Sequence, residues 1–254
     1  MRLNKTVKKS YLRRRGLYGG GKGKHKGSRK NGPAPATPAA GMNNASAAMM
    51  MELMSQYVAA KERFENAVAV DCEMVGVGSK SVLGHVAIVD FNGKQLYNKY
   101  VIPRGGTAAI TNYRERFSGL TEEGLKKVES NNEKRAVKEH SFEIVKREVH
   151  AILKDRIIVG HGLKSDFAAL EFIPNPDNVW DSTEIALYMK DHPYLPGVKQ
   201  AKKLKVLAKE IAGNSIQQES RNGHSPLEDA RASMNIYRLS IFYPKVVYEN
   251  MSKP

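Results

Sequence analysis

The stretch NAVAVDCEM at residues 66–74 is a short apolar run that leads directly into two carboxylates, Asp71 and Glu73. Small and β-branched residues in such a run favour a buried β-strand. Because side chains alternate across a strand, Asp71 and Glu73 are expected on one face and Cys72 on the other. The strand therefore presents two carboxylates at its C-terminal end, where α/β sheets tend to place functional sites.

Two further strand-like runs follow, HVAIVDF at residues 85–91 and QLYNKYVI at residues 95–102. Asn92 and Gly93 lie between them and form a strong signal for a tight hairpin turn. The three runs together predict an antiparallel meander.

The second half of the chain alternates helical and strand-like segments. The spacing of Phe142, Val145, Val149 and Ile152 predicts a helix, and Ser141 is a candidate N-cap. The later segments are predicted as strands at residues 156–160 and 177–182, a helical turn at 166–172, and helices around 199–212 and 227–243. Strands followed by alternating helices and strands predict an α/β fold, with a mixed sheet and helices on its faces.

Composition divides the chain into four segments. Residues 1–41 combine basic runs with Gly- and Pro-rich stretches, so we expect a disordered basic tail. Residues 42–65 contain good helix formers and predict a linker helix. Residues 66–245 are expected to form the folded domain, and residues 246–254 a C-terminal tail.

The positive charge is concentrated at the N-terminus. The 254 residues carry a formal charge of +15, yet residues 1–31 alone hold 12 basic residues and no acidic one. A tail of this charge attracts polyanions by releasing their condensed counterions. Nucleic acid is therefore the expected partner class, although basic runs are also typical of nuclear addresses and of solubilising termini.

Cys72 is the only cysteine, which fits a reducing compartment because no disulfide can form within the chain. No stretch approaches the roughly 18 to 20 apolar residues of a membrane span, and the N-terminus lacks a hydrophobic signal region. We expect neither secretion nor membrane insertion. The nucleus, including the nucleolus, is the expected location, with the mitochondrion as the alternative because an acid-free, Arg-bearing terminus also suits a transit peptide.

Two more carboxylates lie at predicted strand ends. Asp166, in VGHGLKSDF, is either a helix N-cap or, if Ser165 occupies that position, free to face a metal. Asp181 is a further candidate acid for the same site, but a turn or cap role is the favoured interpretation.

The stretch HSPLEDAR at residues 224–231 places His224 before the last helix and Asp229 in its first turns. Carboxylates that cluster repel one another unless a cation joins them, and hard divalent ions prefer oxygen ligands. An imidazole is well suited to accept a proton from water near neutral pH. The pattern predicts a metal-dependent phosphodiester hydrolase.

These stretches resemble the DEDDh group of 3′-5′ exonucleases, closest to the branch that contains RNA exonuclease 4 and the interferon-stimulated exonuclease. The resemblance covers roughly residues 66–243 and implies a ribonuclease-H-like mixed sheet, an antiparallel meander plus parallel strands flanked by helices. The motifs that carry it are AVDCEMVGVG, HVAIVDFNG, YVIP, TNYRERFSGLT, DRIIVGHGLKSDF and HSPLEDARASM. Ser165 and Pro226 depart from the family pattern, and residues 191–203 have no confident match in it.

The resemblance also implies roles for individual residues. The metal-associated acids would be Asp71, Glu73, Asp166 and Asp229, and His224 would be the general base. Two divalent ions, Mg²⁺ or Mn²⁺, would serve the reaction, which releases nucleoside 5′-monophosphates. The expected contacts to the terminal nucleotide are Met74, Val75, Tyr113, Arg114 and Phe117, with core packing as the competing interpretation of Phe117.

A 3′-5′ exonuclease acting on single-stranded RNA ends, in ribosomal RNA processing or RNA turnover, is the leading hypothesis. A DNA-directed exonuclease of the same fold is one alternative. A non-catalytic RNA-binding or ribosome-assembly factor is another, but such a protein has no need for all five catalytic residue types.

Overall fold

The computed structural model describes residues 44–136, 138–217 and 223–251, so the tail expected at residues 1–41 lies outside the described part. The chain divides into two units, residues 1–52 and residues 53–254. The predicted linker helix is observed as α2 (Asn44–Glu65). None of the described helices is both long enough and apolar enough to cross a membrane.

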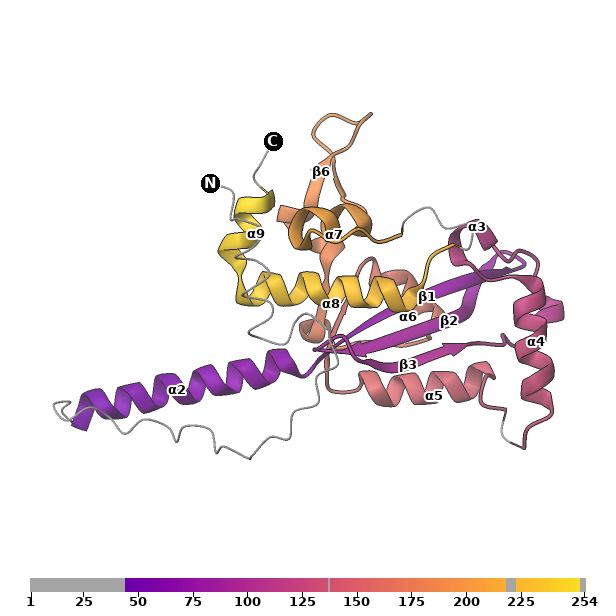
Figure 1. The fold of residues 1–254 in the computed structure, drawn as a ribbon, viewed down its shortest axis with the longest axis horizontal. Coiled ribbons are helices and arrows are strands. Elements are labelled where there is room, and N and C mark those ends of the chain that lie inside the picture. The colour runs from indigo at the N-terminus through magenta and orange to yellow at the C-terminus, as the bar shows by residue number, and fades with distance from the viewer. Residues whose placement is uncertain (1–43, 137, 218–222, 252–254) are drawn as a thin grey trace, which may run out of the picture. The chain divides into compact units, whose positions relative to one another are not determined.

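A five-stranded sheet in the order β3-β2-β1-β4-β5 forms the centre of the second unit (Figure 1). The strands are β1 (Ala67–Val77), β2 (Lys80–Asp90), β3 (Gln95–Tyr100), β4 (Ile157–Gly160) and β5 (Val179–Asp181). Strands β1, β2 and β3 pair antiparallel, whereas β4 and β5 pair parallel beside β1. The predicted meander and mixed sheet are confirmed, and Gly93 has a φ of 79° in the predicted hairpin turn.

Helices cover both faces of this sheet: α5 (Phe142–Leu153) and α6 (Leu163–Ala169) on one side, α8 (Pro226–Phe242) on the other. The alternation along β1 decides which residues meet which helix. Val68, Val70 and Cys72 pack in the cluster that contains α5 and α6 residues. Ala67 and Ala69 pack with buried residues of α8. Asp71 and Glu73 continue the row that begins with these two alanines.

The remaining elements surround this core. They are η1 (Thr107–Ala109), α3 (Glu115–Ser118), α4 (Glu122–Glu133), η2 (Pro176–Asn178), η3 (Ser182–Glu184), η4 (Ala186–Tyr188), β6 (Met189–Asp191), β7 (Lys199–Ala201), α7 (Leu204–Ala212) and α9 (Pro244–Met251). The helix predicted from residue 199 begins at Leu204 instead, because residues 199–201 pair with β6.

The C-terminal tail predicted for residues 246–254 is wrong for its described part. Pro244 ends α8 but also opens α9, since proline is tolerated in the first turn of a helix. Val247 is only 2% exposed and packs in one cluster with Leu207 and Ile211 of α7. The folded domain therefore continues to at least Met251.

The start of α6 is fixed by a residue from another strand. Gly162 is the N-cap with a φ of 79°, so neither Asp166 nor Ser165 occupies that position. The buried carboxylate of Asp181 accepts hydrogen bonds from the N–H groups of Gly162 (2.8 Å) and Leu163 (2.7 Å). It also accepts hydrogen bonds from the backbone N–H and the hydroxyl of Thr183, which confirms the predicted cap role of Asp181.

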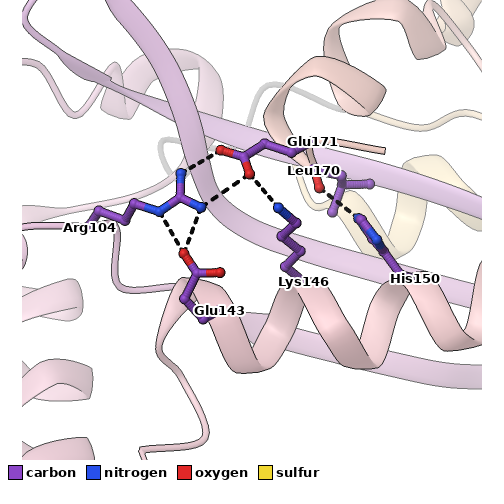
Figure 2. Close-up of polar contacts among 6 residues, drawn as sticks. All are labelled: Arg104, Glu143, Lys146, His150, Leu170 and Glu171. Carbon is purple, nitrogen blue, oxygen red and sulfur yellow. Dashed lines mark hydrogen bonds and ion pairs between the residues drawn. The ribbon is translucent and has the colours of Figure 1, made fainter. Parts of the chain in front are cut away.

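The other end of α6 is tied to α5 by charged side chains. Figure 2 shows the guanidinium of Arg104 between the carboxylates of Glu143 and Glu171, with Lys146 on the second oxygen of Glu171. Glu171 has a φ of 50°, a backbone conformation that is uncommon for residues other than glycine. Exposed ion pairs contribute little individually, so this network orients the chain after α6 more than it stabilises the fold.

Asp181→Ala is expected to lower the free energy of unfolding by about 2–4 kcal/mol, because it leaves several backbone and side-chain donors without their acceptor. Urea denaturation measures the change. Asp181→Asn keeps one acceptor oxygen and should lose less. A loss below about 0.5 kcal/mol for the alanine variant would contradict the capping role.

Candidate active site

Four carboxylates converge where β1 extends past its parallel neighbour. Strand β4 pairs only with Ala67–Ala69, so the later residues of β1 have no strand on that side. Helix α6 follows β4 after a short turn and places Asp166 there, in contact with the backbone N–H and thiol of Cys72. Helix α8 lies over the other face and carries Asp229 in its first turn. Asp71 and Glu73 complete the group from β1.

These acids strongly perturb one another. Asp166 and Asp229 are 5% and 4% exposed. Burial, and then the charges of the other three acids, raises the pKa of Asp71 well above its ordinary value. Burial and the charges of Asp229 and Asp166 raise the pKa of Glu73 to about 8. Burial likewise raises the pKa of Asp166 to about 7 and that of Asp229 to about 6. Such a group either retains protons or takes up a cation.

The arrangement fits a hard divalent cation. Glu73, His224 and Asp229 offer ligand atoms that all lie within 4.8 Å of one another. The Oδ1 atom of Asp229 is buried and has no hydrogen-bond partner among the described residues. Because buried carboxylate oxygens are rarely left unpaired, and oxygen-rich sites suit Mg²⁺ or Mn²⁺, this atom is a strong candidate ligand.

His224 lies on the loop before α8, as expected, and this loop is held against α3. The backbone N–H of His224 donates to the carbonyl of Phe117 at 2.8 Å. Gly223 has a φ of 72°, and a Cβ at this position would lie only 2.2 Å from the nitrogen of Gly119. Glycine is therefore required at residue 223 for the approach. The imidazole Nδ1 lies 3.8 Å from Oδ2 of Asp229, and the side chain is 42% exposed.

Gln217 belongs to the site although no sequence pattern selects it. Its side-chain Nε2 donates to Oδ2 of Asp229 at 2.6 Å, and its backbone N–H donates to Glu228 at 3.1 Å. Neither its residue type nor its spacing distinguishes it from Gln218 next to it. Only the path of the chain between α7 and α8 brings it to the acid.

Three of the expected substrate contacts are partly or wholly in the core. Val75 is fully buried with Leu120 and Leu125, so its side chain does not line an exposed surface. The register between β1 and β2 shifts between Glu73 and Met74, where Gly84 is the extra residue of a bulge in β2. Met74 and Tyr113 are partly buried and pack against separate hydrophobic clusters.

The other two expected substrate contacts, Arg114 and Phe117, are exposed. Phe117 is 65% exposed, so the competing core-packing interpretation of this residue is wrong. Arg114 has a φ of 54°, and its Nη1 donates to Oγ of Ser81 at 2.7 Å. Residues 111–117 line an open surface cavity of about 450 Å³. The loop that offers these groups is the one that also holds the His224 backbone.

Known proteins share sequence with this chain. The exonuclease family model RNase_T matches residues 68–237. RNA exonuclease 4 of Mus musculus is 39% identical over 175 residues, which are 67% of this chain and 35% of that protein. Apoptosis-enhancing nuclease of Homo sapiens is 33% identical over 177 residues, 68% of this chain and 49% of that protein. This chain thus corresponds to less than half the length of these relatives.

Among solved structures, the Pan2 catalytic unit of Neurospora crassa, with its protease and nuclease domain, is similar in fold. The TM-score is 0.54 at 19% identity, over 74% of this chain and 30% of that one. The mixed sheet with helices on both faces is therefore the ribonuclease-H-like fold expected from the sequence. With its acids gathered beside the middle of β1 and the family model matching most of its domain, the chain belongs to the exonuclease family.

Proposed function

We propose that this protein is a metal-dependent 3′-5′ exonuclease of the DEDDh type that acts on RNA and releases nucleoside 5′-monophosphates. The observation that carries the proposal is the convergence of four mutually repelling carboxylates beside an imidazole. The relatives named RNA exonuclease 4 favour RNA over DNA as the substrate.

Asp71, Glu73, Asp166 and Asp229 would hold two divalent ions, Mg²⁺ or Mn²⁺. When bound, such ions activate water and stabilise the charge of the phosphate and the leaving oxygen. Gln217 holds Oδ2 of Asp229 and leaves Oδ1 unpaired in the buried site, so the carboxylate is already oriented before a cation arrives.

His224 would accept the proton of the attacking water. Its partly exposed side chain can pass that proton to solvent, while the nearby carboxylate of Asp229 stabilises the imidazolium that forms. The terminal nucleotide would bind beside residues 111–117. Phe117 offers an exposed ring for base stacking there, and Arg114 offers donors for a phosphate.

Purified protein should shorten a 5′-labelled RNA oligomer one nucleotide at a time in Mg²⁺ or Mn²⁺, and EDTA should stop the reaction. An RNA that ends in a 3′-phosphate should resist, because the pocket is expected to accept a terminal 3′-hydroxyl. Gel analysis at nucleotide resolution measures both results. Internal cuts, or faster trimming of a DNA oligomer of the same sequence, would contradict the proposal.

Asp71→Asn and Asp229→Asn should each reduce kcat by at least about a hundredfold, because loss of an outer-shell partner of a metal already costs up to that much. Both variants should fold at least as well as wild type in EDTA, since each removes one of four repelling charges. Asp177→Asn is the matched control, an exposed acid outside the cluster. Normal trimming by either site variant would refute these assignments.

Stability without metal should fall as the pH rises from about 6.5 to 8. A carboxyl whose pKa is higher in the folded than in the unfolded state favours folding at low pH, and this contribution is lost as the pH rises through the folded pKa. Those folded pKa values are about 8 for Glu73 and about 7 for Asp166. His85 and His161, with lowered pKa values, act in the opposite direction only at lower pH.

Urea denaturation in EDTA across this pH range measures the fall, and saturating Mg²⁺ should diminish it because the ions replace the bound protons. A stability that stays constant or rises from pH 6.5 to 8 without metal would show that the acids are not coupled as the structure indicates.

A further inference from the structure

The basic surplus of the domain is concentrated in one short segment. Residues 68–254 hold 27 Lys and Arg against 23 Asp and Glu. Six of these lysines and only one acid, Asp191, lie within residues 189–209, here called the basic arm. The remainder holds 21 basic against 22 acidic residues, so without the arm the domain would carry no positive excess.

The basic arm consists of the β6-β7 hairpin and the N-terminal part of α7. The hairpin is a two-stranded sheet separate from the central one and stands out beside α7 (Figure 1). Leu207 and Ala208 of α7 pack with Ala232 and Ile236 of α8, the helix that carries Asp229. The arm and the candidate active site therefore share one rigid support.

Most of the charge on the arm is available to a ligand. Lys199 pairs with Asp191 at 2.5 Å and Lys202 with Glu210 at 2.8 Å. The other four arm lysines are exposed and form no ion pair with any described residue; they are Lys190, Lys203, Lys205 and Lys209. Unpaired lysines at this density are the usual means of following a phosphate backbone.

The tip of the hairpin adds an aromatic group. Tyr194 is 85% exposed, and His192 is its only ring neighbour among the described residues, at a centroid distance of 6.2 Å. Leu195 and Val198 are 52% and 45% exposed on the same turn. An exposed ring on the same segment as unpaired cations supplies base stacking as well as phosphate attraction, the two elements of sequence-independent single-strand binding.

We propose that the basic arm binds the single-stranded RNA upstream of the 3′ end, with lysines on the phosphates and Tyr194 stacked on a base. The identity of the ligand as RNA rests on the proposed exonuclease function. The binding surface for the upstream strand is separate from the carboxylate cluster. Charge complementarity favours a polyphosphate over a protein, because a single acid is interspersed among the six lysines.

The combined variant Lys203→Gln, Lys205→Gln and Lys209→Gln tests the electrostatic part. Fluorescence anisotropy with a 20-nucleotide oligouridylate in EDTA should show about tenfold weaker binding by the full chain at 0.1 M salt. The slope of log K against log salt should become shallower by about 2, since each phosphate contact on a single strand contributes about 0.7.

The matched control is Lys127→Gln, Lys134→Gln and Lys138→Gln, which removes the same charge from exposed lysines in and after α4. It should weaken binding less than about twofold. If both triple variants weaken binding equally, or if neither does, the arm does not hold the strand and the proposal is overturned.

Tyr194→Ala should weaken binding about fivefold without changing the salt slope, whereas Tyr194→Phe should bind like wild type because stacking needs the ring and not the hydroxyl. Equal affinity of the alanine variant and wild type would refute the stacking contact. Trimming assays in Mg²⁺ separate the two proposals: a wild type that binds through the arm but cuts no RNA would refute the exonuclease function and leave the arm intact.

Discussion

The mutual repulsion of four carboxylates is the constraint to which the rest of this structure responds. Burial raises the proton affinity of all four acids, and the charges of neighbouring site acids raise that of Asp71 and Glu73 further. A fold that holds such a group needs stabilisation from apolar packing elsewhere to offset the repulsion and burial of the acids. The two layers on either side of β1 supply it, because fully buried aliphatic side chains contribute on the order of 1.5–3 kcal/mol each.

The acids meet because neighbouring strands differ in length. If β4 paired along the whole of β1, a strand would cover the edge at which Asp166 now lies. Since β4 ends early, α6 enters beside the later residues of β1, and Asp181 fixes its first turn from the next strand. Helix α8 approaches from the opposite face with Asp229. Three elements that are distant in the sequence thus supply one site.

Much of this could be predicted from local sequence. Alternation and turn chemistry identify the meander, and helical spacing identifies α5 and α8. Carboxylates and a histidine in three short stretches selected the five site residues, and the resemblance supplied their roles. Features set by long-range contacts were missed: the hydrogen bond from Gln217 depends on the path between two helices, and the burial of Val75 depends on packing with Leu120 and Leu125. The continuation into α9 depends on a cluster shared with α7, which a local pattern does not contain.

The contact between Gly223 and Gly119 has a consequence for how this protein can change over time. The position of the His224 imidazole is set by the close approach of two backbone segments, at Gly223 and Gly119, and not by contacts between side chains. A hydrogen atom is the only substituent with room at the α-carbon of residue 223. A residue that contributes no side chain to the site thereby becomes intolerant of replacement.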